Sequence, residues 1–122
     1  MKKTTLLLAL AASLWATAVS AMTVQEFLTT ANGIPRNPTA LLRSDTRRLM
    51  DEVKLAFRTV GEEQDAARAA GRRPATCVPD SKVRISPDDI LNRFNAIPAA
   101  RRNISVTQAI REWMAERYPC PA

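Results

Sequence analysis

Apolar residues recur at helical spacing in four separate segments of the chain, and this pattern does most to limit the folds open to it. Pro and Gly residues separate the segments, and no two stretches alternate in the way that paired strands require. The spacing predicts helices at about 24–31, 45–70, 87–97 and 106–118. The sequence therefore predicts a small all-α domain of about four helices, one of them long.

The N-terminal segment has the pattern of a secretory signal peptide. A basic start, Met1–Lys3, precedes the apolar run Leu6–Val19, and Val19–Ala21 offers small residues for cleavage. The run is shorter than the roughly 20 apolar residues that a spanning helix needs, although an uncleaved anchor is the alternative. We predict a signal peptide at 1–21, a single domain at 22–122, a periplasmic location and no stable membrane insertion after cleavage.

Both cysteines, Cys77 and Cys120, lie in the part of the chain that would be exported. An even number of cysteines in an oxidising compartment predicts a disulfide bond. It would close a loop of about 44 residues and stabilise the domain by roughly 4 kcal/mol in the chain-entropy model. A pair of free thiols or one reactive cysteine is the alternative, but no His or Cys-x-x-Cys spacing would activate such a thiol.

The longest predicted helix carries an apolar stripe in which one member is polar. The stripe consists of Leu49, Val53, Ala56, Phe57, Val60, Gln64 and Ala67. Gln64 alone breaks its apolar character, and Gly71 is expected to end the helix. The expected aromatic anchors of the core are Phe27, Phe57, Phe94 and Trp113, and the expected helix N-caps are Thr23, Ser44, Ser86 and Ser105.

The residue types argue against catalysis. The chain has no His, the commonest general base and metal ligand. Adjacent acidic pairs, such as Asp88–Asp89, fit solvation or helix capping better than paired-carboxylate chemistry. No Ser-x-x-Lys motif or Asp-rich calcium loop is present. We therefore predict no enzyme activity, no catalytic residue, no cofactor and no metal site.

The charge of the exported chain points to a protein partner. Without Lys2 and Lys3 it holds 16 basic and 12 acidic residues, a net charge of +4, and 14 of the 16 are Arg. An exported protein rarely meets nucleic acid, whereas the Arg side chain forks onto carboxylates at protein interfaces. We expect an acidic protein surface as the partner and no nucleic acid. Membrane headgroups, or a solvated Arg surface without a partner, are the alternatives.

Two basic loops are the candidate partner-binding sites. The first surrounds Cys77, and the second connects the last two predicted helices. Their candidate residues are Arg72, Arg73, Lys82 and Arg84 in the first loop, and Arg101 and Arg102 in the second. Exposed Arg side chains without a partner are the alternative, because few residues of an interface carry its binding energy.

Two cysteine elements resemble those of a known family. The segment Gly71–Pro79 (GRRPATCVP) is similar to the Gly…Cys-Val-Pro element of the Rap/Tai family of periplasmic immunity proteins, which are linked to type VI secretion. The segment Arg117–Pro121 (RYPCP) resembles the terminal aromatic-Pro-Cys element of that family. The resemblance spans roughly Asp51 to Ala122, and the segment 84–89 departs from the family pattern.

The resemblance implies a small helical protein, often a homodimer, that binds a cell-wall-degrading amidase effector and blocks it. Cys77 and Cys120 correspond to the family's disulfide pair, and Val78, Pro79 and Pro119 correspond to structural positions of its motifs. The loop that contacts the effector varies within the family, so no residue is carried over for it. A periplasmic acid-stress chaperone, or another envelope protein such as an inhibitor of a foreign lysozyme, remains the alternative.

Overall fold

Four α-helices and two 3₁₀ turns make up the fold. The computed structural model describes residues 21–80 and 83–121, so nearly all of the predicted signal peptide and Lys82 lie outside the described residues. Along the described chain the elements are α1 (Val24–Asn32), η1 (Pro38–Leu42), α2 (Ser44–Ala69), α3 (Pro87–Asn95), η2 (Ala99–Arg101) and α4 (Val106–Arg117). No named strand occurs among these residues, and the predicted all-α fold is confirmed.

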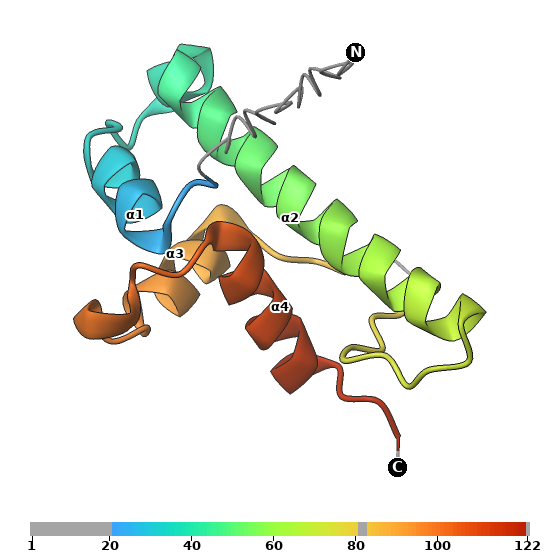
Figure 1. Ribbon diagram of the computed structural model, residues 1–122. Helices are drawn as coiled ribbons and strands as arrows, with labels where there is room; N and C mark the ends of the chain where they lie inside the picture. Colours follow the sequence, from blue (N-terminus) through green and yellow to red (C-terminus); the bar gives the residue numbers. More distant parts are fainter. Residues whose placement is uncertain (1–20, 81–82, 122) are drawn as a thin grey trace, which may run out of the picture.

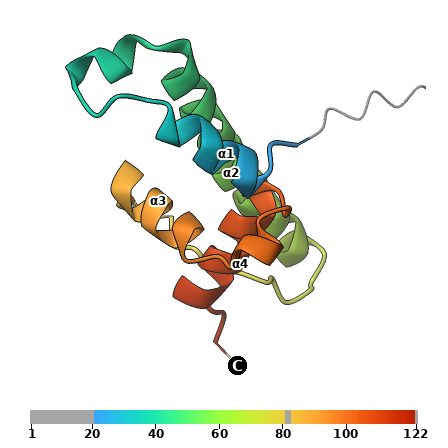
Figure 2. The ribbon, with the colours of Figure 1, turned by 90° about the vertical axis from the view of Figure 1, so that its left-hand side faces the viewer.

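The long helix α2 runs along the molecule, and the other helices lie on one side of it (Figure 1). Its most extensive helix contact is with α4, and α1 also packs against it. The view turned by 90° shows α1 in front of α2, and α3 on the side away from the loop that follows α2 (Figure 2). None of the described helices combines the length and the apolar character needed to cross a membrane.

The core lies between α2 and the three shorter helices. Phe27 and Phe94 are buried and meet edge to face, with ring centroids 5.0 Å apart. Edge-to-face pairs of this kind add stability beyond the area that they bury. Phe57 and Trp113 are only partly buried and pack against the outside of the same cluster. Two of the four predicted aromatic anchors thus form the centre of the core, and the other two cover its edge.

The segment before α1 pairs with the segment before α4. Thr23 and Ser105 form an isolated antiparallel bridge. The Val24 amide donates to Ile104 O at 2.9 Å, and the Val106 amide donates to Met22 O at 2.9 Å. Helices α1 and α4 therefore begin side by side, and the buried side chain of Met22 joins the core.

Three of the four predicted N-caps are present. The hydroxyls of Thr23, Ser86 and Ser105 each accept a hydrogen bond from the amide three residues later, and Asp89 completes a capping box with Ser86. The prediction for Ser44 is wrong, because Ser44 is already the first helical residue of α2. The extended residue before it is Arg43, whose side chain makes no capping hydrogen bond.

Candidate functional site

A disulfide bond joins the loop after α2 to the end of the chain beyond α4. The bond links Cys77 and Cys120, whose Cα atoms are 4.9 Å apart. Next to it the Cys77 amide donates to Tyr118 O at 2.9 Å, and the Arg73 guanidinium donates to Cys120 O at 2.8 Å. The predicted disulfide is confirmed, and it brings the two cysteine elements side by side.

The turn that leads out of α2 is held in one conformation. Gly71 adopts a positive φ of 68°, which costs a residue with a Cβ about 1–2 kcal/mol. The Arg72 amide donates to Ala67 O at 2.8 Å, and the Gly71 amide donates to Arg68 O at 3.1 Å. This is the paired hydrogen-bond pattern of a Schellman motif. It ends the helix and sets the direction in which Arg72 and Arg73 leave it.

The side chain of Gln64 holds the next part of the loop. Gln64 is only 5 % exposed, and its Oε1 accepts from the Val78 amide at 2.8 Å and from the Thr76 hydroxyl at 3.1 Å. Its Nε2 donates to Val78 O at 3.1 Å. The side-chain amide thus pairs with both backbone groups of Val78, as a neighbouring strand would. The polar break in the apolar stripe is therefore the attachment point of the loop.

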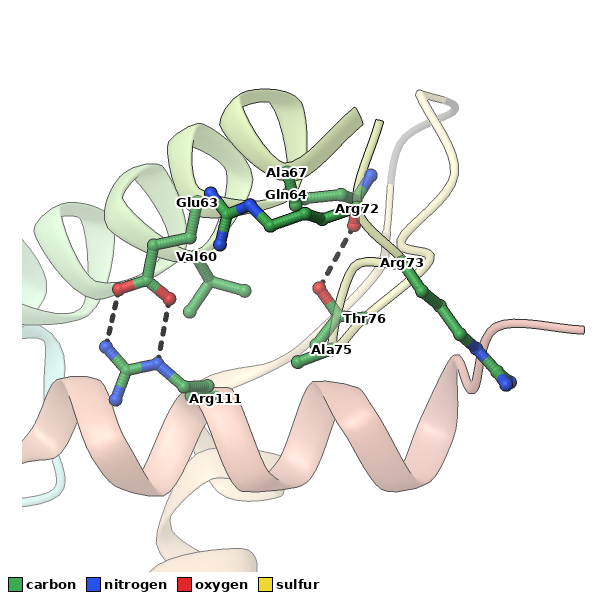
Figure 3. Close-up of a pocket in the computed structure, with 9 residues that line it drawn as sticks. All are labelled: Val60, Glu63, Gln64, Ala67, Arg72, Arg73, Ala75, Thr76 and Arg111. Carbon is green, nitrogen blue, oxygen red and sulfur yellow. Dashed lines mark hydrogen bonds and ion pairs between the residues drawn. The ribbon is translucent and has the colours of Figure 1, made fainter. Parts of the chain in front are cut away.

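A small cavity of about 250 Å³ lies between α2, this loop and α4 (Figure 3). We call it the arginine pocket. Its lining comes from Val60, Glu63, Gln64 and Ala67 of α2, from Arg72, Arg73, Ala75 and Thr76 of the loop, and from Arg111 of α4. Its lining contains three Arg and one Glu, but the guanidinium of Arg73 points away (Figure 3), so Arg72, Arg111 and Glu63 supply the charge that faces it. Its charged groups can hold an anion but include no pair of nucleophile and base.

An ion pair links α2 to α4 on one side of the arginine pocket. Arg111 Nε donates to Glu63 Oε2 at 2.8 Å, and its Nη2 donates to Oε1 at 2.6 Å. These hydrogen bonds, together with the charge of Arg111, lower the pKa of the Glu63 carboxyl in spite of partial desolvation. Arg111 also donates to the side chain of Gln108, so its guanidinium is fixed from two sides.

The structure separates the two predicted basic loops. Arg72 and Arg73 line the arginine pocket, and Arg84 is exposed just before α3. Lys82 lies outside the described residues. The 3₁₀ turn η2, whose last residue is Arg101, lies on the other side of the molecule (orange in Figure 1).

The Arg side chains of the second loop make contacts within the fold. Arg101 forms an ion pair with Glu112 at 2.9 Å. Arg102 donates to Ile97 O at 3.0 Å and to Asn95 O at 3.1 Å, which satisfies carbonyl groups at the end of α3. The assignment of all six residues to partner binding stays a prediction.

Sequence reasoning missed several residues of the arginine pocket. Glu63 and Arg111 come together across 48 positions of the chain, and no local pattern predicts such a contact. Gln64 carried a usable signal, because a single amide within an apolar stripe must find buried hydrogen-bond partners. Thr76 carried none, since it is an ordinary loop residue until Gln64 is placed opposite its hydroxyl.

Comparisons with known proteins find no matching family model, no similar curated protein and no similar solved structure. Among the described residues, no group of three or more His, Cys, Asp or Glu side chains could hold a metal ion.

Proposed function

We propose that this chain is a periplasmic binding protein that neutralises a secreted peptidoglycan amidase by protein–protein inhibition. The Cys77–Cys120 disulfide is the observation that carries the proposal, because it holds the two elements that resemble the Rap/Tai family against each other. The signal-peptide pattern supports a location in which a cell-wall hydrolase would be met.

An inhibitor needs a surface that is ordered before it binds. The loop from Arg72 to Val78 is held by the Schellman turn, by the side chain of Gln64 and by the disulfide. A loop that is already ordered loses less conformational entropy on association than a flexible one. This anchored loop is therefore a candidate binding surface.

The charge of the loop supports an acidic partner. Arg72, Arg73 and Arg84 are exposed and form no ion pair within the described part of the chain, whose salt bridges involve Arg43, Arg93, Arg101 and Arg111. Exposed charges of one sign speed association with a surface of the opposite sign and select against like-charged partners. This supports an acidic surface around the hydrolase cleft as the target.

The test is an inhibition assay with a purified peptidoglycan amidase that is delivered by type VI secretion. We expect the mature protein to slow the release of cell-wall fragments in a stoichiometric manner. Arg84→Glu should weaken inhibition by about tenfold, whereas Arg36→Glu, which changes an exposed Arg between α1 and η1, should leave it unchanged. Full hydrolysis by this amidase in the presence of excess protein contradicts the proposal.

A second candidate, an acid-stress chaperone, is favoured by exposed apolar side chains. Leu41 and Leu42 of η1 are 73 % and 80 % exposed. Two lowered pKa values argue against activation by acid. Hydrogen bonds from Ser86 lower the pKa of Asp89, and the hydrogen bond from Arg93 lowers the pKa of Glu116. These contacts resist protonation in mild acid. Strong binding of a hydrophobic dye near the ordinary carboxyl pKa would favour the chaperone, and unchanged fluorescence would exclude it.

A further inference from the structure

The arginine pocket has the size and charge of a receptor for a single acidic side chain. We propose that it receives an Asp or Glu side chain of the protein partner, as an anchor for the complex. The inference rests on the proposed function for the existence of that partner. It goes further in naming the pocket, the chemical group and the residue, Arg72, that recognises it.

Arg72 is placed to meet an incoming anion. Its backbone is fixed by the hydrogen bond to Ala67 O, and its side chain extends from the loop along the pocket toward α2 (Figure 3). Within the described part of the chain its guanidinium has no hydrogen bond or ion pair. Arg73 differs, since its guanidinium points away and donates to Cys120 O. Arg72 is therefore the cation of the pocket whose donors remain available.

The other polar groups of the pocket already have partners. The side chain of Gln64 bonds to the Thr76 hydroxyl and to the backbone of Val78. Arg111 is held in a fixed position by Glu63 and Gln108, and the Glu63 carboxylate balances its charge. An incoming carboxylate would therefore accept charge-assisted hydrogen bonds from Arg72, whose donors remain available.

The shape of the pocket suits a side chain with a short apolar stem. Val60, Ala67 and Ala75 supply apolar wall, and the cavity of about 250 Å³ has room for an acidic side chain. The carboxylate of Glu63 also lies in this lining. The apolar wall favours a carboxylate that is carried on a short apolar stem over inorganic phosphate, which has no apolar part to bury.

The first test is a titration of the full mature protein. NMR signals of the backbone amides and of the Arg Nε–H groups report binding. The probes are acetyl-Gly-Glu-Gly-amide, the matching Gln peptide and inorganic phosphate. We expect the Glu peptide to shift the signals of Arg72, Ala75 and Thr76, and the other two probes to shift them weakly. Equal shifts with the Gln peptide, or stronger shifts with phosphate, overturn the inference.

Variants separate the pocket from general surface charge. Arg72→Gln should weaken binding of the Glu peptide by about tenfold or more, as expected for loss of a charged hydrogen-bond donor. The control Arg68→Gln removes an exposed Arg of α2 that does not line the pocket, and it should leave binding within about twofold. Both variants should unfold like the parent protein, which thermal unfolding checks. Equal weakening by both variants overturns the inference.

A second test uses the amidase itself. If Arg72→Gln inhibits it as well as the parent protein, the pocket is not the anchor and the inference fails, while inhibition as such stands. If the parent protein inhibits no amidase but still selects the Glu peptide over the Gln peptide, carboxylate recognition is supported and the proposed function fails. The two hypotheses can thus be rejected separately.

Discussion

The two ends of α2 are built in different ways. At its C-terminal end, the disulfide, the side chain of Gln64 and the Glu63–Arg111 ion pair hold the following loop and α4 in place. At its N-terminal end, η1 contains no buried residue, and Leu41 and Leu42 are exposed. Met50 and Leu55, in the first half of the helix, also have exposed apolar side chains.

The comparison shows that stability and accessible apolar surface lie in different places. The contacts at the C-terminal end join segments that lie 12 to 48 positions apart in sequence, so losing one of them increases the freedom of the loop or of α4. Side chains that are exposed at the N-terminal end contribute little, because they gain little burial on folding. Substitutions at the two ends should therefore have very different effects on the free energy of unfolding.

The largest effect is expected from the disulfide. Replacing both cysteines, Cys77→Ser with Cys120→Ser, opens a loop with a sequence separation of 43 and should cost about 4 kcal/mol in the chain-entropy model. Urea unfolding with and without reductant measures this loss. The parent protein under reductant should match the double variant. A loss below about 1 kcal/mol would mean that the two segments stay together without the bond.

A smaller loss is expected when the polar clamp is removed. Gln64→Leu keeps a side chain of similar size but leaves the Val78 amide and the Thr76 hydroxyl without their partner, at a cost of about 2–3 kcal/mol. The control Leu55→Gln, at a half-exposed position of the same helix, should change stability by less than about 0.5 kcal/mol. Equal effects of the two variants in urea unfolding would contradict the conclusion that the C-terminal end of α2 contributes more to stability than its first half.

Replacing each of two glycines in this region by Ala should change the free energy of unfolding in opposite directions. Gly71→Ala places a Cβ at a φ of 68° and should cost about 1–2 kcal/mol. Gly61→Ala lies inside α2, where nothing is within 4 Å of the added carbon, and should gain up to about 1 kcal/mol from helix propensity. Thermal unfolding of both variants checks the signs. A gain from Gly71→Ala would contradict the anchored turn.

The Glu63–Arg111 ion pair predicts a modest dependence of stability on pH. The folded protein lowers the pKa of Glu63 below its ordinary value of about 4.5, so the unfolded chain binds more protons in acid. The contribution is complete above the ordinary pKa and disappears as the pH falls through the lowered folded pKa. It should be about 0.5–1 kcal/mol, since the Glu63 side chain is 46 % exposed.

Removing the charge of Glu63 tests this contribution. Glu63→Gln should lower stability at neutral pH and flatten the acid side of the stability profile. Glu62→Gln is the control, because Glu62 forms no ion pair within the described residues. Parallel profiles for Glu63→Gln and the parent protein would show that the ion pair contributes nothing.

The smallest effect is expected at the other end of α2. Leu41→Ser combined with Leu42→Ser should change the free energy of unfolding by less than about 0.5 kcal/mol, because both side chains are already in solvent. Denaturant unfolding measures this directly. A large loss would mean that these leucines are covered in the native protein, and the concentration dependence of unfolding would then show whether a second copy covers them.

Local signals in the sequence account for the secondary structure. Helical spacing of apolar residues, Ser86 with Pro87 at the start of α3, and Gly71 after α2 act within a few residues of one another. For this reason the helices could be predicted, and most boundaries were close. The cap of α2 was misplaced by one residue because Ser44 and Arg43 differ in backbone conformation, which residue preference alone does not decide.

By itself, the sequence determined the helical class, the long central helix and the pairing of its two cysteines. Only the tertiary structure decided that Gln64 holds the loop, that Arg111 meets Glu63, and that Arg72 lies along a pocket while Arg102 serves the end of α3. The physical reason is the distance in sequence over which each interaction acts. Helix propensity and capping act over a few residues, whereas a pocket forms where segments tens of residues apart pack together.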